Sequence, residues 1–573
     1  MESRLAASAF ILVVAAYLFL GGMGVTDRDN PEPREAAYNL LARGLLAGHL
    51  YLDKAAPDVL TSLKDPYDPE ANRVAREDPR YRLHDLSYRG GRLYLYFGVA
   101  PAVLVFIPWH FLTGGWLPHW GAVVLLCSIG LAVNVALLLS IRRRVFPGAP
   151  GWVPPILVLV LGLGSYAPLL AARADIWEVP IAFSYLAVSA ALGFLWRCLT
   201  LPGKEAGSLA CASMAFGLAF LARPTVLPSA AILLLFLLLG NRRREVGAWV
   251  AGVLPLAFCG ALAALYNADR FGSPFDFGEA WQLAGVYVAH LRTFGASFLG
   301  TNLRLYLAQS VSLTRIFPYF HEPALGPLRE ILPVDHGAVE HISGILLCAP
   351  ILWAALFVPG FIRRAHPQPA LRLLAISAAW VSASSLLLVS FFFGTCSRYQ
   401  FEFVPALALL ASVGVLALEA PLRGAALHVA RCVWIPLALA SGAFGVLYGI
   451  DRCAGDHNDY AVQFLIRGNT RAAGHEIETA QFLSPGNPMS RLLTGVSLST
   501  SGHALDARRE LEALVLDFPG DARAHYWLGN VLLGLGLRDQ ATAEHRLASG
   551  LDPTDETIRA MAEKDQAEPS RPR

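Results

Sequence analysis

Charged residues are scarce in this chain of 573 residues. They make up 16% of it, against 55% hydrophobic residues, and Lys occurs only at positions 54, 64, 204 and 564. The basic residues are dispersed at the ends of apolar runs and form no stripe, which excludes nucleic acid as a partner. The sequence also lacks a GxxxxGK[ST] phosphate loop, an HExxH motif and any CxxC pair. Because no nucleotide-binding loop is present, the energy for any reaction must come with the substrate.

Long apolar runs dominate instead. Several windows of about 20 apolar residues can each cross a bilayer core of about 30 Å, so the chain is an integral membrane protein. The first run, 5–23, is long for a signal-peptide core and lacks a cleavage motif before Thr26, so we interpret it as a retained anchor. Arg clusters at 142–144, 242–244 and 363–364 follow every second run, which places them, and the amino terminus, in the cytoplasm.

One run does not fit this count. If 5–23 leaves the cytoplasm and 119–141 returns to it, the run 93–112 cannot also cross. Its interior Pro101 and Pro108 favour a broken helix at the outer interface. The predicted fold is therefore all-α, a polytopic transmembrane bundle of about 11 spans plus one juxtamembrane or re-entrant segment. The alternative is that 93–112 is an ordinary span and that the amino terminus lies outside.

A repeat follows the last apolar run. Gly468, Gly502 and Gly536 are spaced by 34 residues, and Ala and Pro residues show the same spacing. This period, with small residues where two helices cross, resembles the tetratricopeptide repeat. Such a domain either binds a peptide or partner protein or is a rigid cap. We predict two domains: a membrane domain, 1–450, with outer loops 26–92 and 267–341, and an extracytoplasmic repeat domain, 451–573, with helix pairs at 455–488, 489–522 and 523–556 and a disordered tail.

The predicted topology brings charged groups from distant segments to the outer face. Placing a charge at the bilayer centre costs about 2.5–3.5 kcal/mol, and placing it at the membrane boundary costs less. Charged groups at the boundary can therefore form a cavity there. Each of these groups taken alone has a purely structural explanation. For example, Arg173 could form an ion pair with Asp175, and Glu402 could form one with Arg398. We predict that together they form one site, which comprises Asp27, Asp29, Glu32, His84, Asp85, Arg89, Arg92, Arg173, Asp175, Glu178, Arg223, Arg398, Tyr399 and Glu402.

Two acidic-His pairs in the long loop, Asp335-His336 and Glu340-His341, could hold a metal ion but are more often solvated. We interpret them as solvated and predict no metal site. No cofactor is predicted, and assistance by a divalent cation stays open.

The outer loop after the first run, with its Asp residues, is followed by YNLLARGLLAGHLYLD at 38–53. This arrangement resembles the GT-C glycosyltransferases, which use polyprenyl-phosphate-linked sugars and include protein O-mannosyltransferase and aminoarabinose transferase relatives. The resemblance covers about residues 5–450. Further motifs that carry it, in chain order, are LSYRGGRLYLYFGVAPAVLVFIP (86–108), Arg-Pro-Thr (223–225), YNADRFGSPFDFG (266–278) and SRYQFEFVPALALLA (397–411).

The resemblance implies transfer of a sugar from a lipid-linked donor to an acceptor hydroxyl outside the cytoplasm, with inversion. Asp27 or Asp29 would act as general base. The Lys-Pro-Pro or His-Pro-Pro element of some family members is missing, and Val-Ala-Pro stands in its place at 99–101, which leaves Arg89 or Arg92 as substitutes for binding the donor phosphate. Four arginines would bind the phosphate, namely Arg92, Arg173, Arg223 and Arg398. Aromatic residues of the long loop would line the mouth of a lipid groove, namely Trp281, Tyr287, Phe294, Phe298, Tyr306 and Phe317.

The expected location is the inner membrane of a bacterium, with a lipid-linked sugar, membrane lipids and a protein bound by the repeats as partners. Two other classes compete with the enzyme. A transporter or flippase of lipid-linked sugars would show two corresponding halves and ionisable groups at the bilayer midplane, which this sequence does not show. A non-catalytic assembly protein would work through its repeats, and its outer carboxylates would be dispensable.

Overall fold

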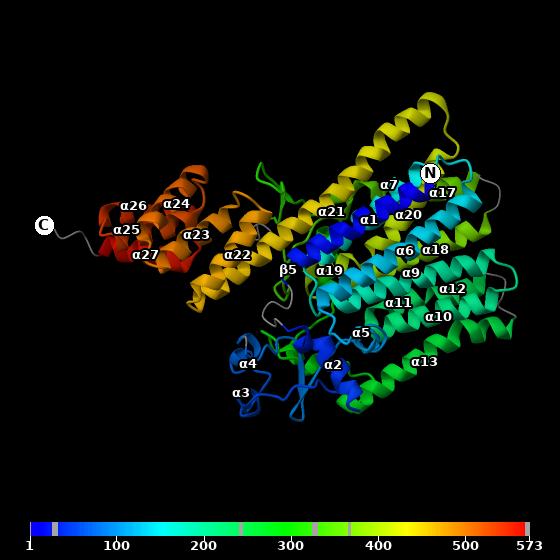
Figure 1. The fold of residues 1–573 in the computed structure, drawn as a ribbon, viewed down its shortest axis with the longest axis horizontal. Coiled ribbons are helices and arrows are strands. Elements are labelled where there is room, and N and C mark those ends of the chain that lie inside the picture. Colours follow the sequence, from blue (N-terminus) through cyan, green and yellow to red (C-terminus); the bar gives the residue numbers. More distant parts are fainter. Residues whose placement is uncertain are drawn as a thin grey trace. The chain divides into compact units, whose positions relative to one another are not determined.

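The computed structural model describes residues 2–25, 32–78, 80–239, 245–323, 331–364 and 368–567 (Figure 1). The chain divides into two compact units. The first unit comprises Met1–Ser312 and Glu322–Gly449, and the second comprises Leu313–His321 and Ile450–Arg573.

Long apolar helices form the first unit. Within the described residues, seven helices are long and apolar enough to cross a membrane: α1 (Glu2–Met23), α6 (His119–Val145), α9 (Glu178–Thr200), α10 (Glu205–Ala222), α13 (Val246–Phe271), α18 (Pro369–Ser390) and α21 (Gly424–Ile466), whose last part belongs to the second unit. Five shorter apolar helices lie at Ala102–Thr113, Val153–Gly162, Pro224–Leu238, Pro350–Arg363 and Val404–Glu419. The prediction of a mostly helical integral membrane protein is confirmed, and the number of crossings stays a prediction.

The remaining elements of the first unit are short. Those before α9 are η1 (Pro33–Glu35), α2 (Ala37–Leu46), α3 (Asp58–Thr61), α4 (Arg73–Glu77), β1 (Ser87–Arg89), β2 (Arg92–Tyr94), η2 (Ala102–Phe106), α5 (Ile107–Thr113), α7 (Val153–Leu163) and α8 (Ala167–Ala172). Those after α10 are η3 (Pro224–Val226), α11 (Leu227–Ala230), α12 (Ile232–Leu239), η4 (Glu279–Trp281), η5 (Val288–His290), α14 (Ala296–Ala308), β3 (Ser312–Leu313), β5 (Val339–Glu340), α16 (Ile345–Cys348), η6 (Pro350–Leu356), α17 (Phe357–Arg364), β6 (Thr395–Cys396), α19 (Ser397–Gln400) and α20 (Val404–Glu419). β4 (Phe320–His321) lies in the second unit.

The apolar run 93–112 is not one helix. Its first residues belong to the β1–β2 hairpin, and only the end of the run is helical, in η2 with five residues and α5 with seven. At 1.5 Å per residue these two elements span about 18 Å, well short of a bilayer core of about 30 Å. The prediction that this run is not an uninterrupted span is confirmed.

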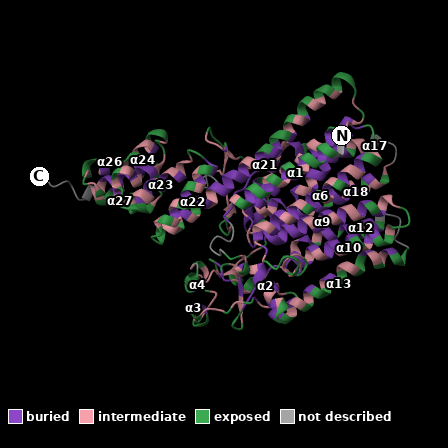
Figure 2. Cartoon of the chain, viewed as in Figure 1, coloured by how far each residue is buried: buried purple, intermediate pink, exposed green. Residues whose placement is uncertain are grey.

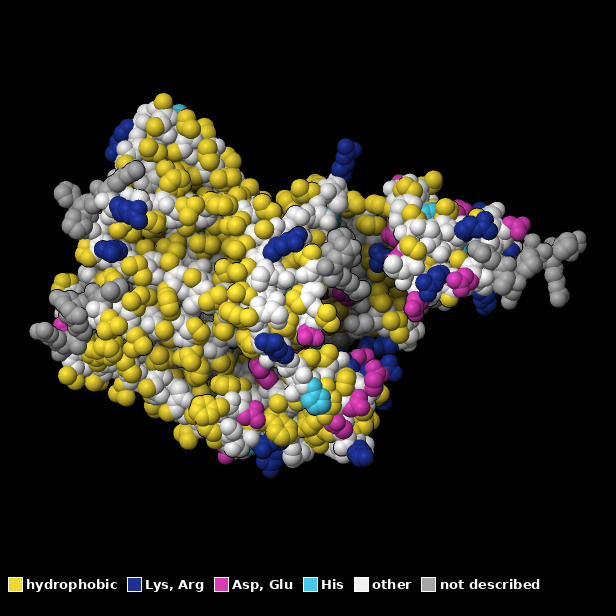
Figure 3. All heavy atoms as spheres, turned by 180° about the vertical axis from the view of Figure 1, so that it is seen from behind, with side chains coloured by type: hydrophobic (Ala, Val, Ile, Leu, Met, Phe, Trp, Pro, Cys, Tyr) yellow, Lys and Arg dark blue, Asp and Glu magenta, His cyan; other side chains and the backbone are white. Residues whose placement is uncertain are grey.

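Helix burial separates the centre of the first unit from its periphery. In the apolar window of α9, 72% of the residues are buried, against 28% in α1 and in α13 (Figure 2). α9 packs against α6 and α10, and α10 packs against α13. Large apolar side chains of the outer helices stay exposed, among them Ile11, Leu12, Leu254, Phe258 and Leu265. Figure 3 shows apolar side chains over most of the visible face of the helices, with charged groups gathered over the loops. Such an apolar exterior suits contact with lipid.

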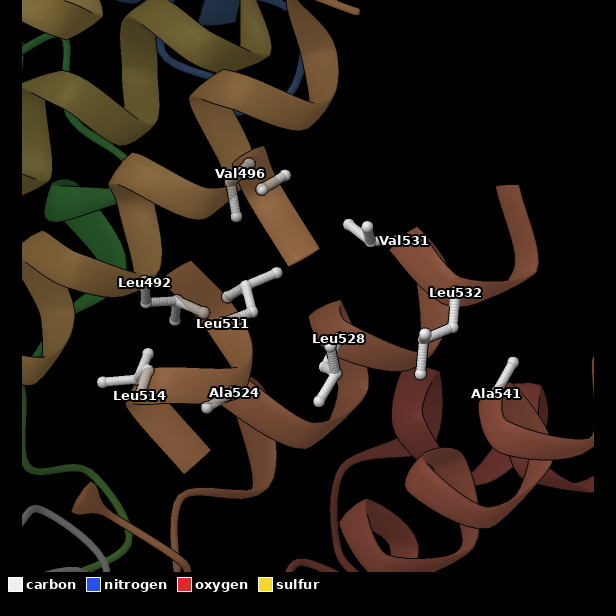
Figure 4. Close-up of a cluster of buried hydrophobic side chains, with 10 residues drawn as sticks. Leu492, Val496, Leu511, Leu514, Ala524, Leu528, Val531, Leu532 and Ala541 are labelled. Atoms are coloured by element: carbon white, nitrogen blue, oxygen red, sulfur yellow. The ribbon is translucent and has the colours of Figure 1, made fainter. Parts of the chain in front are cut away.

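The second unit is built from helices that recur every 34 residues. Helices α23 (Pro488–Thr500), α25 (Ala522–Gly534) and α27 (Glu556–Ala567) alternate with α22 (Thr470–Leu483), α24 (Ala504–Asp517) and α26 (Arg538–Leu551). The repeated glycines, Gly468, Gly502 and Gly536, have φ of 73°, 85° and 79°, a left-handed conformation that favours glycine. Leu492, Leu511 and Leu528 belong to the core between these helices (Figure 4). The predicted repeats are present, and residues 568–573 of the predicted tail lie outside the described residues.

Candidate functional site

A pocket in the first unit collects side chains from segments far apart in the sequence. It has about 790 Å³ of empty space, part of it open to solvent. The residues that line it are Tyr96 and Phe97 after β2, Trp177 before α9, Ala222, Arg223, Pro224 and Thr225 after α10, Phe277, Glu279 and Phe294 in the long loop, Leu388, Val389 and Phe392 at the end of α18, and Arg398 and Tyr399 in α19. Only three of these, Arg223, Arg398 and Tyr399, belong to the site predicted from the sequence.

Arg223 is placed by the break between α10 and η3. Its backbone is extended, with φ −151° and ψ 109°, because the following Pro224 disfavours a helical conformation at the preceding residue. The guanidinium pairs with Glu402, with Nη2 2.6 Å and Nε 2.8 Å from Oε1. The second oxygen of Glu402 accepts a hydrogen bond of 3.0 Å from Thr225 Oγ1.

This pair is buried, with 12% of the Arg223 side chain and 7% of the Glu402 side chain exposed. Burial alone would lower the pKa of Arg223, but the charge and hydrogen bond of Glu402, together with the neighbouring Tyr399 and Tyr96, outweigh burial and raise that pKa above its usual range. Two buried charges are tolerated because they satisfy each other, and removing either one would leave the other unpaired. The alternative explanation, in which Glu402 pairs with Arg398, is therefore wrong.

Arg398 and Arg173 share one carboxylate, that of Glu340. Glu340 lies in β5, which pairs in parallel with β6 so that Glu340 stands opposite Cys396, two residues before Arg398. Arg398 Nη1 donates a hydrogen bond of 2.7 Å to Glu340 Oε2, and Arg173 pairs with Oε1 of the same group. The interpretation of Glu340 as a solvated loop residue was wrong, because a short parallel strand pair aligns it with two arginines.

Trp177 connects the arginines to the first loop. The guanidinium carbons of Arg173 and Arg398 lie 5.2 and 5.5 Å from its ring centre, at cation–π distance. Its Nε1 donates a hydrogen bond of 2.9 Å to Asp85 Oδ2, and His84 Nε2 lies 3.7 Å from the other oxygen of Asp85. The predicted residues His84 and Asp85 thus lie beside the pocket and support one of its walls.

Asp175 and Glu178 lie behind this wall. Asp175 Oδ1 is 3.5 Å from His119 Nδ1, and its backbone N–H donates a hydrogen bond of 3.0 Å to Glu178 Oε2. Burial would raise the pKa of Asp175, but the hydrogen bond and charge of His119, helped by the Ile176 backbone N–H and the charge of Arg173, together outweigh burial and lower this pKa. Glu178 is buried, 3.9 Å from Arg398 Nη1. The expected pairing of Asp175 with Arg173 is replaced by the contact with His119.

The other predicted site residues are not brought to the pocket. Arg89 lies 4.8 Å above the ring of Trp281 and donates a hydrogen bond of 3.2 Å to the carbonyl of Arg270. Arg92, its partner in the hairpin, lies 4.5 Å above the ring of Tyr51. Glu32 is exposed at the start of η1 and does not line the pocket. The two predicted catalytic residues, Asp27 and Asp29, lie outside the described residues.

Sequence analysis missed Glu279, Trp177, Tyr96 and the role of Glu340. Glu279 directly follows the YNADRFGSPFDFG motif, which was the one available signal for it. Of the aromatic residues expected to line a groove mouth, Phe294 lines the pocket, whereas Phe298 and Tyr306 are 1% and 0% exposed and cannot. Among the residues described, no group of three or more His, Cys, Asp or Glu side chains could hold a metal ion.

No protein-family model and no curated protein matches this chain. Its structure is similar to that of ArnT from Cupriavidus metallidurans bound to undecaprenyl phosphate, at 14% identity, with 90% of this chain and 80% of that chain covered and a TM-score of 0.41. For ArnT in the apo state, the identity is 16%, both coverages are 80%, and the TM-score is 0.40. It is also similar to the oligosaccharyltransferase AglB from Archaeoglobus fulgidus, in complex with an inhibitory peptide and a dolichol-phosphate, at 12% identity, with 77% and 56% covered and a TM-score of 0.36.

Proposed function

We propose that this chain is a membrane glycosyltransferase that moves a sugar from a polyprenyl-phosphate donor to an acceptor hydroxyl on the extracytoplasmic face. The observation that best supports this proposal is the convergence of Arg223 and Arg398 on one pocket, with their guanidinium carbons 5.4 and 5.3 Å from the ring centre of Tyr399. Guanidinium groups bind phosphate through charge-assisted, often bidentate hydrogen bonds. Such bonds strengthen as the leaving phosphate gains charge in the transition state, which lowers the barrier to transfer.

The carboxylates around the arginines are compatible with this role. A guanidinium has five N–H donors, and Glu402 is contacted by Nε and Nη2 of Arg223, which leaves the donors on Nη1 for a phosphate. Glu402 and Glu340 thus orient the guanidinium groups before the substrate binds. The apolar part of the pocket, formed by Phe277, Phe294 and Phe392, offers surface for the donor's lipid or for the faces of its sugar ring.

In this proposal Arg173, Arg223 and Arg398 bind the phosphate, and a carboxylate accepts the proton of the acceptor hydroxyl. Asp27 and Asp29 are the candidates from the sequence for that carboxylate. Arg89 and Arg92 take no part, because their guanidinium groups are stacked on rings outside the pocket. The protein lies in a bacterial inner membrane, and its repeats bind a protein partner outside the cytoplasm.

The proposal is tested by glycan analysis of a strain that lacks this chain. The deletion is expected to remove one glycan species, and the full-length chain is expected to restore it. The variants Asp27→Asn and Asp29→Asn, singly and together, then test the proton acceptor. An identical glycan profile with and without the chain contradicts the proposed function. Unchanged glycan in all three variants rejects both aspartates as the base and leaves the transfer itself intact.

A further inference from the structure

Glu279 contributes a carboxylate to the pocket, and within the described residues this carboxylate forms no ion pair. It lies in η4, is exposed and lines the pocket together with Arg223 and Arg398. Within the described part of the chain, its carboxylate has no hydrogen-bond or ion-pair partner. The neighbouring carboxylates are engaged: Glu402 by Arg223, Glu340 by Arg398, and Asp85 by Trp177. Glu279 is therefore available to a substrate in a way that these three are not.

The turn that carries Glu279 is held on several sides. Asp276 accepts hydrogen bonds of 2.8 Å from the Gly278 backbone N–H and 2.9 Å from Trp281 Nε1. The Gly278 carbonyl accepts a hydrogen bond of 2.8 Å from Ser87 Oγ. Gly278 has φ 94°, and a Cβ there would lie 2.4 Å from the ring of Phe271, so this position requires glycine. These contacts fix the direction in which Glu279 leaves the backbone, although the side chain itself is unpaired.

The surroundings of Glu279 also suit a proton acceptor. Glu279 keeps an exposed side, but the pocket walls on its other side partly desolvate the carboxylate and raise its pKa above its usual range. The nearby charge of Asp276 acts in the same direction. The charge of Arg223 lowers this pKa and so opposes part of the effect. The other titratable or charged groups facing the pocket are Tyr96, Arg398 and Tyr399. A carboxylate with a raised pKa is a stronger base than an ordinary carboxylate.

We infer that Glu279, in place of Asp27 or Asp29, is the general base of the sugar transfer, an inference that rests on the proposed function. The acceptor oxygen attacks the anomeric carbon of the donor, and its proton passes to a carboxylate oxygen of Glu279. The bond between the anomeric carbon and the phosphate oxygen breaks, and its electron pair stays on the phosphate, where the arginines stabilise the added charge. The protonated carboxyl group then releases its proton to water. No oxidant, reductant or metal ion is required by this balance.

The test uses membranes of the deletion strain that carry full-length variants, with the rate at which the missing glycan appears as the readout. Glu279→Gln is expected to lower this rate by about 100-fold or more, as for loss of a general base, and Glu279→Asp is expected to restore part of it. The matched control is Glu70→Gln, which removes an exposed carboxylate of the first loop outside the pocket. In the wild type, the rate should rise with pH through the pKa of Glu279, and this rise should be absent in Glu279→Gln.

Two further measurements separate a chemical role from a structural one. Glu279→Gln should keep the unfolding temperature of the wild type in nanodiscs, and it should keep the shift of that temperature caused by undecaprenyl phosphate. A rate within about threefold of the wild type, where a lost base predicts about 100-fold or more, overturns the inference. So does a loss of rate accompanied by loss of the lipid-induced shift. If Asp27→Asn or Asp29→Asn abolishes transfer while Glu279→Gln does not, the base is that aspartate. If the wild-type chain itself restores no glycan, the proposed function is contradicted, and the assignment of the base falls with it.

Discussion

The two units of the molecule pair their charges in different ways. In the second unit, one contact recurs at each repeat: His457 with Glu476 at 2.5 Å, Arg491 with Glu510 at 3.0 Å, and His525 with Glu544 at 2.6 Å. Both members advance by 34 residues from one repeat to the next. In the first unit, the Arg223–Glu402 pair joins segments with no such relation. Sequence period therefore predicts which charges meet in the second unit, whereas in the first unit the tertiary packing, including the β5–β6 pair, decides it.

The largest expected effect comes from removing an arginine of the pocket. Under the proposed function, Arg398→Gln should lower the rate of glycan transfer by about 100-fold or more, because the phosphate of the proposed donor loses a charge-assisted donor in the transition state. Arg92→Gln is the matched control. Its guanidinium is stacked on Tyr51 outside the pocket, and its rate should stay within about threefold of the wild type, since a stacked surface arginine contributes little more than packing. If both variants lost the same fraction of the wild-type rate, the claim that Arg398 acts in the pocket and Arg92 does not would be contradicted.

The next effect compares an Arg–Glu pair from each unit. Glu402→Gln should destabilise the first unit by about 3 kcal/mol, because it leaves the buried Arg223 guanidinium without its counter-charge. Glu510→Gln, in the pair with Arg491, should cost about 1 kcal/mol or less, because 32% of the Glu510 side chain is exposed to solvent. Chemical denaturation of the full chain in detergent, followed by circular dichroism, gives both values. If both variants lost a similar free energy of unfolding, burial would not explain a difference in strength between the two ion pairs.

The smallest effect tests two glycines within the repeats. A Cβ on Gly529 would lie 2.4 Å from His545, so Gly529→Ala should destabilise the second unit by about 1–3 kcal/mol. Gly474 lies inside α22 with nothing within 4 Å of an added Cβ. Gly474→Ala should therefore stabilise the unit by about 0.5–1 kcal/mol, because alanine is the better helix former. The same denaturation experiment measures both, and a change of the same sign in both variants would contradict the packing account.

The predictions from the sequence succeeded where information is local. The repeat was recognised because turn glycines such as Gly468 recur at a fixed spacing. The run 93–112 was correctly predicted not to be one span, but for a different reason: η2 and α5 follow each other without a break at Pro108, and the run is shortened because its first residues belong to the β1–β2 hairpin. Pairings across the first unit were predicted less well. Arg173 was expected to pair with its near neighbour Asp175, but it pairs with Glu340, which β5 carries from a distant loop.

The apolar runs, the small number of charges and the 34-residue period were sufficient to determine a helical membrane protein that ends in repeats, because each of these signals acts over a few turns of helix. The tertiary structure decided which charges meet. Arg223, Glu279 and Arg398 share a pocket because the segments that follow α10, α13 and α18 line it together, and no spacing in the chain encodes that meeting. A buried charge needs a partner wherever the fold can supply one, so the partner is chosen by proximity in space and not by position in the sequence.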